Sequence, residues 1–288
     1  MPKYTSFSES NSIKAKSNSS VFSTKNPIVM GILNVTEDSF FDGGLYLHEE
    51  QIISRCKKML DEGASIIDIG AQSSRPSATL IQADDELLKL LPIIKLLKTE
   101  IPEIIISIDT FWAKTANKCI RAGAHIINDI SAGEMDENMF NTIAKLKVPY
   151  IIMHMQGTPQ NMQENPTYNN VVTEVISYFD KKIALLKAKG VKEIIIDPGF
   201  GFGKTLVHNY QLLNKLEQLN QFELPVLIGT SRKSMIYKLL DTKPQEALNG
   251  TSVTNTMALQ KGASILRVHD VKEAMECIKI TTFAKNNC

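Results

Sequence analysis

Hydrogen-bonding side chains stand at the ends of several isoleucine-rich runs in this sequence. Asp109, Asn128 and Asp197 each close such a run, in "IIISID", "HIIN" and "EIIID". An ionised carboxylate among buried apolar residues loses its hydration and needs donors in place of water. Asp and Asn also begin ordinary turns, because their side chains bond to nearby backbone, and for each residue alone that interpretation stays open. Together, the two acids and the amide favour a binding site for a ligand rich in N–H groups.

Basic residues extend this hypothesis. Lys233 stands in "TSRKS", and Arg267 and His269 lie in the run "SILRVHD". Carboxylates accept from ring N–H and amino groups, an amide serves as donor or acceptor, and a lysine donates to a ring nitrogen or oxygen. This set of groups suits a flat heterocycle such as a guanine-like ring or a pterin. The basic residues, with Arg75, favour an anion beside that ring.

The segment "DPGFGFGKT", residues 197–205, looks at first like a phosphate-binding loop. Such a loop requires a glycine five positions before its Gly-Lys pair. Counting back from Gly203, that position is Pro198, which has no N–H to offer. The dinucleotide-binding spacing fails as well, because Gly199, Gly201 and Gly203 are evenly spaced. The sequence therefore argues against an ATP-binding loop at this place.

Composition sets the class of protein. The 288 residues are 43% apolar and 22% charged with a formal net charge of +1, so neither nucleic acid nor a membrane surface is favoured as a partner. No apolar run approaches the roughly 20 residues that cross a bilayer. The four cysteines lie far apart without a Cys-x-x-Cys pair, which favours reduced thiols in a cytoplasmic protein. Residues 1–25 are polar and serine-rich, and we expect them to form a tail.

Short β-branched runs alternate with longer amphipathic stretches from residue 28 onward. The runs are "PIVMGILN", "SIIDIG", "IIISIDT", "HIINDI", "PYIIMHM", "EIIIDPG", "PVLIGTS" and "SILRVHD". Continuous Ile/Val-rich runs are typical of parallel strands buried on both faces. Eight strands, each followed by a helix, predict one α/β domain over residues 26–288, a closed (β/α)8 TIM barrel, with an open doubly wound sheet as the alternative. Active sites of such barrels lie at the carboxyl ends of the strands, where the polar residues above would meet.

Eight motifs in order from Pro27 to the last helix resemble one family. They are "MGILNVTEDSFFDGG", "DIGAQSSRPSA", "SIDT", "NDISAG", "MHMQGTPQNMQ", "DPGFGFGKT", "GTSRKS" and "RVHD". They are similar to the motifs of dihydropteroate synthase, a pterin-binding barrel family. The resemblance implies a homodimeric transferase of folate biosynthesis and a sulfonamide target. Such an enzyme joins (7,8-dihydropterin-6-yl)methyl diphosphate to p-aminobenzoate, with Mg²⁺ on the diphosphate. The implied mechanism is dissociative, so that pyrophosphate leaves before the amine attacks.

The resemblance also implies a role for each matching residue. The pterin-binding residues would be Asp109, Asn128, Met153, Asp197 and Lys233. The diphosphate-binding residues would be Asn34, Arg75, Arg267 and His269, with Asn34 also the ligand of Mg²⁺. The p-aminobenzoate pocket would use Phe40, Ser74, Arg75, Pro76, Phe202, Lys233 and Ser234. The catalytic residues would be Asp42, Arg75 and Lys233, with Asp42 near the cation and the attacking amine.

This chain departs from the family pattern in two expected loops. Glu37, Phe41, Ala71, Gln72 and Ser77 stand where the family usually has Pro, Ser, Gly, Glu and Gly, and they bear on p-aminobenzoate affinity and sulfonamide sensitivity. Two alternatives remain, a pterin-binding methyl-transfer barrel and a catalytically inactive pterin-binding barrel. The first needs no diphosphate pocket, so "NVTEDSFFDGG", "SRKS" and "RVHD" argue against it. Against the second argues the retention of Asn34, Asp42, Arg75, Lys233, Arg267 and His269.

Overall fold

The computed structural model describes residues 26–35, 45–72 and 80–287. The strands of these residues are β1 (Ile28–Asn34), β2 (Ile66–Gly70), β3 (Ile106–Asp109), β4 (Ile126–Asp129), β5 (Tyr150–Met153), β6 (Ile194–Asp197), β7 (Leu227–Ile228) and β8 (Ile265–Val268). They form one parallel sheet in the order β6-β5-β4-β3-β2-β1-β8-β7. A bridge between Ile196 and Val226 joins the two ends of this order, so the sheet closes. The predicted (β/α)8 barrel is confirmed.

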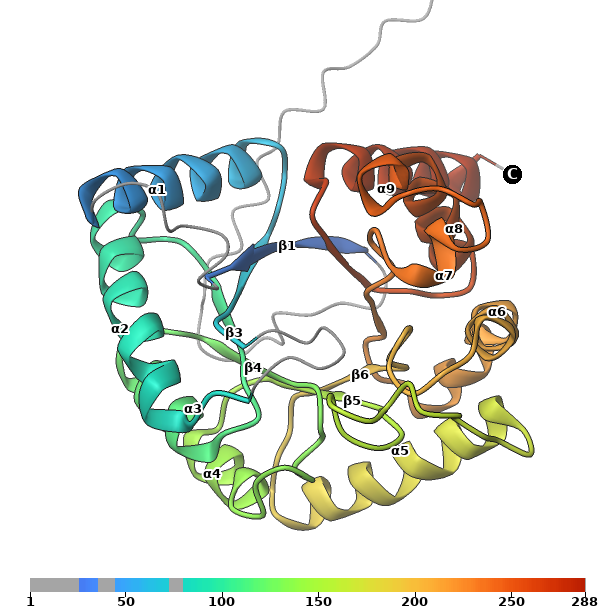
Figure 1. Ribbon diagram of the computed structural model, residues 1–288, viewed down its shortest axis with the longest axis horizontal. Helices are drawn as coiled ribbons and strands as arrows, with labels where there is room; N and C mark the ends of the chain where they lie inside the picture. Colours follow the sequence, from blue (N-terminus) through green and yellow to red (C-terminus); the bar gives the residue numbers. More distant parts are fainter. Residues whose placement is uncertain (1–25, 36–44, 73–79, 288) are drawn as a thin grey trace, which may run out of the picture.

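Helices surround the strands as an outer ring (Figure 1). In the described residues they are α1 (Leu45–Asp61), α2 (Ala83–Glu100), α3 (Ala113–Arg121), α4 (Met139–Leu146), α5 (Val171–Ala188), α6 (Leu206–Asn214), α7 (Ser234–Tyr237), α8 (Leu248–Gln260) and α9 (Val271–Asn286). The 3-10 helices η2 (Leu216–Phe222) and η3 (Pro244–Glu246) follow α6 and α7. None of the described helices has both the length and the apolar character needed to cross a membrane.

One strand is shorter than its sequence run. The run "PVLIGTS" predicts a strand of several residues, but β7 has only two, and its connection to β8 contains the short α7 and η3 as well as α8. The residues that follow β7 leave the sheet at Gly229 and turn toward the inside of the barrel through Lys233, whose ammonium group lies 3.7 Å from a Cβ built on Gly229. Because β7 is short, the segment after it can place the Lys233 side chain at the carboxyl end of the barrel.

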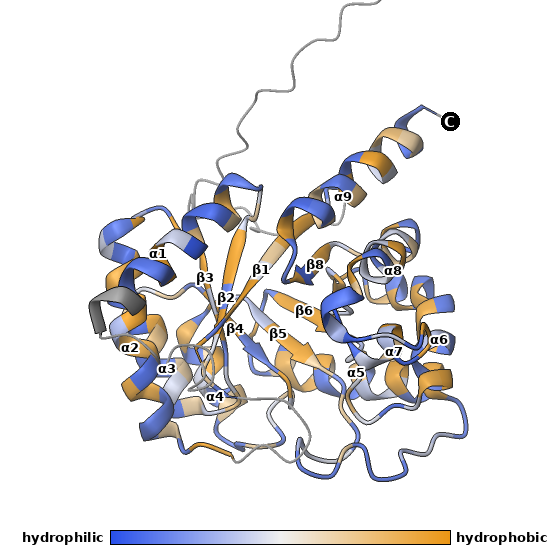
Figure 2. Cartoon of the chain, turned by 45° about the horizontal axis from the view of Figure 1, so that its top comes forward, coloured by the Kyte–Doolittle hydropathy of each residue, from blue (hydrophilic) through white to orange (hydrophobic). Residues whose placement is uncertain are grey.

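The core divides into an inner and an outer part. Between the strands and the helices lies a large apolar cluster that includes Leu90, Ile94 and Phe179. Inside the barrel lies a separate apolar cluster with side chains from all strand regions. Figure 2 shows the corresponding pattern, with apolar strands at the centre and hydrophilic residues on the outer faces of the helices. Burial on both faces explains why the strand runs are continuously apolar rather than alternating.

The segment after β6 packs closely against the end of β5. Gly199 has a φ of +72°, and a Cβ at this position would lie 2.0 Å from the carbonyl oxygen of His154. Gly190, at the end of α5, has a similar φ of +82°, but a Cβ there would meet nothing within 4 Å. Both glycines adopt the left-handed backbone conformation, and only at Gly199 would an added Cβ also collide with neighbouring atoms.

This difference predicts unequal costs for two alanine substitutions. Gly190→Ala pays only for the left-handed backbone, about 1–2 kcal/mol of unfolding free energy. Gly199→Ala adds a collision with the β5 backbone, and we expect a loss of about 3 kcal/mol or more. Urea unfolding of both variants measures the difference. Equal losses would contradict the close packing of the two segments.

Candidate active site

Alternation along the strands decides which side chains face the inside of the barrel. An apolar layer fills the inside toward the amino ends of the strands, and it is formed by Met30, Ile66, Ile105, Ile126, Ile151, Ile195, Leu227 and Ile265. Successive side chains of a strand point to opposite faces, so residues two positions further along face the inside again. A second inward layer therefore lies on the apolar layer, nearer the carboxyl ends of the strands.

The second layer and the strand ends hold most of the predicted site. In the strands, the second layer consists of Ile32, Asp68, Ser107, Asn128, Met153, Asp197 and Arg267. Two residues further along, at the last positions of their strands, lie Asn34, Gly70 and Asp109. The parallel register aligns Asn34 with Gly70, Gly70 with Asp109, and Asp109 with Asn128. The fold thus gathers the predicted pterin and diphosphate residues of the strands at one end of the barrel.

Arg267 of β8 links three strands through two carboxylates. Its Nε donates to Oδ2 of Asp68 at 2.6 Å, and its Nη2 donates to Oδ2 of Asp109 at 2.7 Å. Asn128 Nδ2 donates to the same oxygen of Asp68 at 3.0 Å, which leaves the amide oxygen of Asn128 as an acceptor. Burial opposes the positive charge of Arg267, but Asp68 and Asp109 outweigh burial and raise the pKa of the guanidinium.

Both carboxyl groups of the predicted pterin edge have a pKa above the ordinary value for aspartate. Burial raises the pKa of Asp109 to about 7, although Arg267 acts against the rise. Burial also raises the pKa of Asp197, against the effect of Lys233 and of the Gly199 N–H, which donates to Asp197 Oδ1 at 2.8 Å. A ligand that donates hydrogen bonds to these carboxylates would replace the lost water and favour their ionised form.

Lys233 reaches the same region from the segment after β7. Its Nζ donates to the carbonyl oxygen of Phe200 at 2.7 Å and lies 4.6 Å from the ring centroid of Phe202. Burial lowers the pKa of Lys233 to about 8, while Asp197 acts in the opposite direction. The Lys233 ammonium group therefore interacts both with Asp197, which is expected at the pterin edge, and with the ring of Phe202, which is expected at the p-aminobenzoate pocket.

His269 is held beside this network as a neutral ring. Its Nδ1 lies 3.0 Å from the Ser231 hydroxyl oxygen, which also accepts from the His269 backbone N–H at 3.2 Å. Burial lowers the pKa of His269 to about 4, and the neighbouring Arg267 lowers it further. At neutral pH, His269 can therefore form a hydrogen bond to an anion, but it carries no positive charge.

An apolar cluster lies at the β3–β6 side of the site. Its buried members are Phe111, Ile130, Met153, Met155, Met162 and Phe202, with Leu80, Trp112 and Met135 packed against them. Met153 and Phe202, which the sequence assigns to two different substrates, therefore belong to one continuous surface. Such a surface suits the faces of flat rings whose edges meet the polar residues.

The remaining predicted residues differ in what the structure says of them. Asn34 is exposed at the end of β1, and Ser234 begins α7, which is only four residues long. The brevity of α7 limits any helix-dipole effect on an anion there. Five predicted residues lie outside the described part of the chain, namely Phe40, Asp42, Ser74, Arg75 and Pro76.

Two buried acidic residues of this region, Asp68 and Glu86, have no role in the sequence-based assignment. Asp68 is fully buried and holds both Arg267 and Asn128. Glu86, on α2, is also fully buried, and its Oε2 accepts from the Thr110 hydroxyl at 2.6 Å, next to Asp109. An acidic residue within the otherwise apolar core face of a helix is the signal that could have revealed Glu86.

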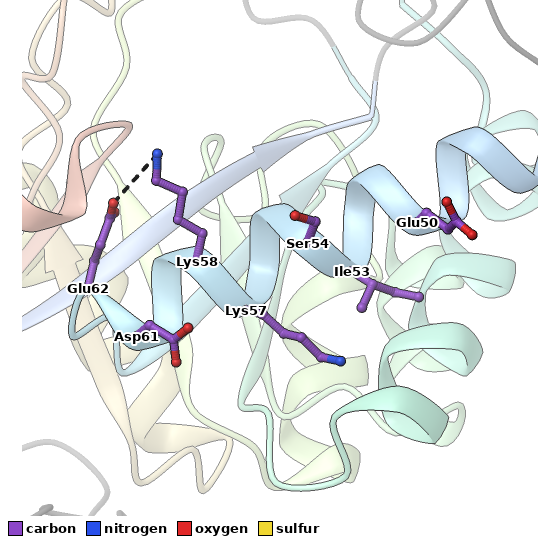
Figure 3. A pocket seen from close by; sticks show the side chains of 7 residues that line it. All are labelled: Glu50, Ile53, Ser54, Lys57, Lys58, Asp61 and Glu62. Atoms are coloured by element: carbon purple, nitrogen blue, oxygen red, sulfur yellow. Dashed lines mark ion pairs between the residues drawn. The ribbon is translucent and has the colours of Figure 1, made fainter.

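A hollow of about 570 Å³ lies on the outside of the barrel and is not part of this site. Its lining residues are Glu50, Ile53, Ser54, Lys57, Lys58, Asp61 and Glu62, on α1 and just after it (Figure 3). The charged groups there are near the surface, and one pair, Lys58 and Glu62, is 3.8 Å apart on successive turns. The hollow lacks the inward-facing polar residues of the strand ends.

Comparison with known proteins agrees with this geometry. The sequence profile of the family described as "Pterin binding enzyme" matches residues 30–269. The dihydropteroate synthase of Escherichia coli K12 is 42% identical over 266 residues, which cover 91% of this chain and 94% of the relative. Two solved structures of dihydropteroate synthase are also similar. One, from Yersinia pestis in a sulfonamide drug complex, has a TM-score of 0.86 and 41% identity over 92% of this chain and 96% of that one. The other, from Xanthomonas albilineans with 4-aminobenzoic acid, has a TM-score of 0.84 and 35% identity over 91% and 94%.

The buried carboxyl group of Glu86 predicts an unusual pH dependence of stability. Burial raises its pKa from 4.5 to about 7, and its Oε1 has no hydrogen-bond partner among the described residues. Because the folded state holds this proton more tightly, the group's contribution to stability falls as the pH rises from about 4.5 to 7. Glu86→Gln keeps an acceptor for Thr110 and removes the titration, so the variant should exceed wild type at pH 8 by about 1–3 kcal/mol and by less at pH 5.

Urea unfolding at pH 5 and pH 8 tests this prediction. Glu50→Gln, at an exposed position of α1, is the matched control and should change little at either pH. A Glu86→Gln variant whose difference from wild type is the same at both pH values would show that Glu86 does not ionise with a raised pKa.

Proposed function

The chain belongs to the dihydropteroate synthase family of pterin-binding enzymes, and from this membership we infer how its site residues share the reaction. It is a transferase of folate biosynthesis, which condenses (7,8-dihydropterin-6-yl)methyl diphosphate with p-aminobenzoate to give 7,8-dihydropteroate and pyrophosphate. The single observation that carries the residue assignment is the meeting of Asp109, Asn128, Asp197 and Lys233 at one end of the barrel.

The edge of the pterin is assigned to the two acids and the amide. Asp109 and Asp197 would accept from ring N–H and amino groups, and the oxygen of Asn128 is oriented to accept because its Nδ2 is engaged by Asp68. Lys233 would donate to the opposite side of the ring, and Met153 would contact its face. The raised pKa values of Asp109 and Asp197 support this assignment, since these buried carboxylates require donors.

The diphosphate is assigned to Asn34, Arg267 and His269, together with Arg75 outside the described residues. His269 would donate a hydrogen bond as a neutral ring, and Arg267 would contribute the donors that Asp68 and Asp109 do not occupy. The site has an exposed amide oxygen at Asn34, and no cluster of three His, Cys, Asp or Glu residues among the described residues could cage a metal. That donor set fits Mg²⁺, which commonly keeps waters and binds through substrate phosphates. Mg²⁺ would neutralise charge on the leaving diphosphate.

The second substrate is assigned to the segments around Phe202. Phe202, Lys233 and Ser234 would contact p-aminobenzoate, with Phe40, Ser74, Arg75 and Pro76 completing the pocket from outside the described residues. We propose dissociative chemistry, in which Asp42 lies near the cation and the incoming amine. Carboxylates around the ring stabilise positive charge that develops there, and in this proposal Asp109 and Asp197 would do so.

We also propose that the chain forms a homodimer in the cytoplasm. Apolar side chains are exposed near the C-terminal helices, at Leu239, Leu240, Val253, Ile280 and Phe283. Val253 and Ile280 line one hollow between α8 and α9, which supports a second copy as the partner of this face. The three described cysteines are buried free thiols, which supports a reducing compartment.

Product formation tests the proposed reaction. Wild type with both substrates and Mg²⁺ should release pyrophosphate and dihydropteroate in equal amounts. Lys233→Met removes a donor that faces Asp197 and Phe202, and we expect kcat/KM to fall about 100-fold or more. Lys261→Met, at a surface lysine bound to Glu217, is the control and should retain activity. Pterin binding without either product would support the inactive barrel, and pyrophosphate alone would mean that the amine pocket fails.

The pH dependence of pterin binding tests the role of Asp109. Its pKa of about 7 means that the carboxylate is partly protonated at neutral pH and accepts fewer hydrogen bonds below it. A ligand that requires the ionised form should bind more tightly as the pH rises through about 7, and the loss of the Lys233 proton near pH 8 should end this rise. Calorimetry with 6-hydroxymethyl-7,8-dihydropterin, which carries no diphosphate, measures this. Asp109→Asn should bind weakly at every pH, whereas Glu50→Gln, at an exposed position of α1, should keep the wild-type slope. A pH-independent wild type would contradict the assignment.

A further inference from the structure

Lys204, the lysine of "DPGFGFGKT", is turned into the protein. Its side chain is only 3% exposed. Its Nζ donates to the carbonyl oxygens of Gly199 at 2.9 Å, Phe202 at 3.0 Å and His154 at 3.2 Å, and it lies 2.9 Å from His154 Nδ1. The proposed reaction, as assigned above, uses neither Lys204 nor His154. A buried ammonium group surrounded by four acceptors is therefore unexplained by the substrate contacts.

The same contacts exclude the phosphate-binding role that the motif first brings to mind. An ammonium group has three N–H donors, and four protein acceptors already surround that of Lys204. His154 serves as one of them in its neutral form, because burial and the nearby Lys204 charge lower its pKa far below the usual range. The His154 ring is itself held edge-on to Tyr178, with ring centroids 4.9 Å apart. The charge of Lys204 thus acts on the backbone of its own segment and of β5.

That segment carries contacts of three proposed substrate-binding groups. The Gly199 N–H donates to Asp197, and the Phe200 carbonyl accepts from Lys233. The ring of Phe202 lies against the Lys233 ammonium group. Lys204 binds the carbonyls of Gly199 and Phe202, which flank Phe200 in the chain. One buried side chain therefore holds the peptide groups that neighbour those bonded to Asp197 and Lys233, and it bonds to the carbonyl of Phe202 itself.

We propose that Lys204, braced by His154, is a positioning residue that shapes the segment after β6 so that Asp197 and Lys233 meet the pterin and Phe202 meets the amine. This inference rests on the proposed function for the identity of the ligands. Two further observations support it. A Cβ on Gly203 would lie 2.4 Å from the Gln156 carbonyl oxygen, so the segment is also packed against the chain after β5. Burial lowers the pKa of Lys204 to about 7 while Asp197 opposes the change, which indicates that the two charges are close.

Lys204→Met tests the proposal, because methionine keeps much of the volume and removes the three donors. The expected result is a rise of about 10- to 100-fold in the Kd for 6-hydroxymethyl-7,8-dihydropterin and in the KM for p-aminobenzoate, since displacements near 1 Å cost factors of this size. Lys182→Met is the matched control. Lys182 also donates to a backbone carbonyl, of Ala132 at 3.0 Å, and pairs with Glu134 at 3.1 Å, but it contacts none of the proposed substrate residues.

The readouts separate positioning from a merely structural role. If Lys204 only stabilises the fold, both lysine variants lose thermal stability while Kd and KM of the folded protein stay within twofold of wild type, and the proposal is overturned. If Lys204→Met does not fold, His154→Phe decides, because it keeps the ring contact with Tyr178 and removes one acceptor of the ammonium group. That variant should show a smaller rise in the same Kd and KM, and unchanged values would overturn the proposal.

The ligand-binding measurement also separates this inference from the proposed function. A wild type that binds the pterin but forms no dihydropteroate would refute the synthase reaction, and the Kd of Lys204→Met would still test the positioning role. A wild type that makes dihydropteroate, with Lys204→Met equal to it in Kd, KM and kcat, would leave the reaction intact and refute the positioning role alone.

Discussion

The arrangement of the site depends on the two ion pairs that Arg267 forms with Asp68 and Asp109. These residues come from β8, β2 and β3, and their hydrogen bonds of 2.6 and 2.7 Å span the inside of the barrel above its apolar layer. Ionised groups taken out of water are costly unless they are paired in good geometry, so removing one partner would leave the others uncompensated. The pairing holds Asp68, and Asp68 in turn holds the Asn128 amide, so the proposed pterin edge is oriented without a ligand. Preorganised groups of this kind need not be rearranged during the reaction.

The described site balances its charges internally. Asp68, Asp197 and Lys204 are buried, and Asp109, Lys233 and Arg267 are partly buried, so three carboxylates face three cations. His269 is neutral because burial lowers its pKa to about 4. Each cation already contacts carboxylate or carbonyl oxygens. These residues therefore offer little surplus positive charge to a diphosphate. This balance is consistent with the proposed reaction, which assigns Mg²⁺ and Arg75 to the leaving group in addition to Asn34, Arg267 and His269.

Periodicity made much of this arrangement predictable. Isoleucine-rich runs at regular spacing predicted a closed parallel barrel, and the strand ends then placed Asp109, Asn128 and Asp197 together because parallel strands share one carboxyl end. The pairing of Asp68 was not predictable in the same way, since its partner Arg267 is 199 positions away and only the closed barrel brings them together. The direction of Lys204 was hidden for a related reason. A motif shows that a lysine follows glycines, but only the packing of that segment on β5 decides whether the ammonium group faces a ligand or the protein.

The difference between residues on strands and residues on connecting segments also bears on where this chain can vary. Groups on strands are held by the sheet and by ion pairs, so we expect the proposed pterin edge to tolerate few changes, whereas binding groups on connecting segments can change with less effect on the fold. Two of the departures from the family pattern, Ala71 and Gln72, lie in the described residues, and both follow β2, which ends at Gly70. Gln72 shows how one of them is accommodated. Its Oε1 accepts from the Ile81 N–H at 2.9 Å, which joins the chain on the two sides of residues 73–79. A glutamate, the usual residue of the family, could accept this bond as well. The change to glutamine therefore keeps the hydrogen bond to Ile81 and removes one negative charge from this segment.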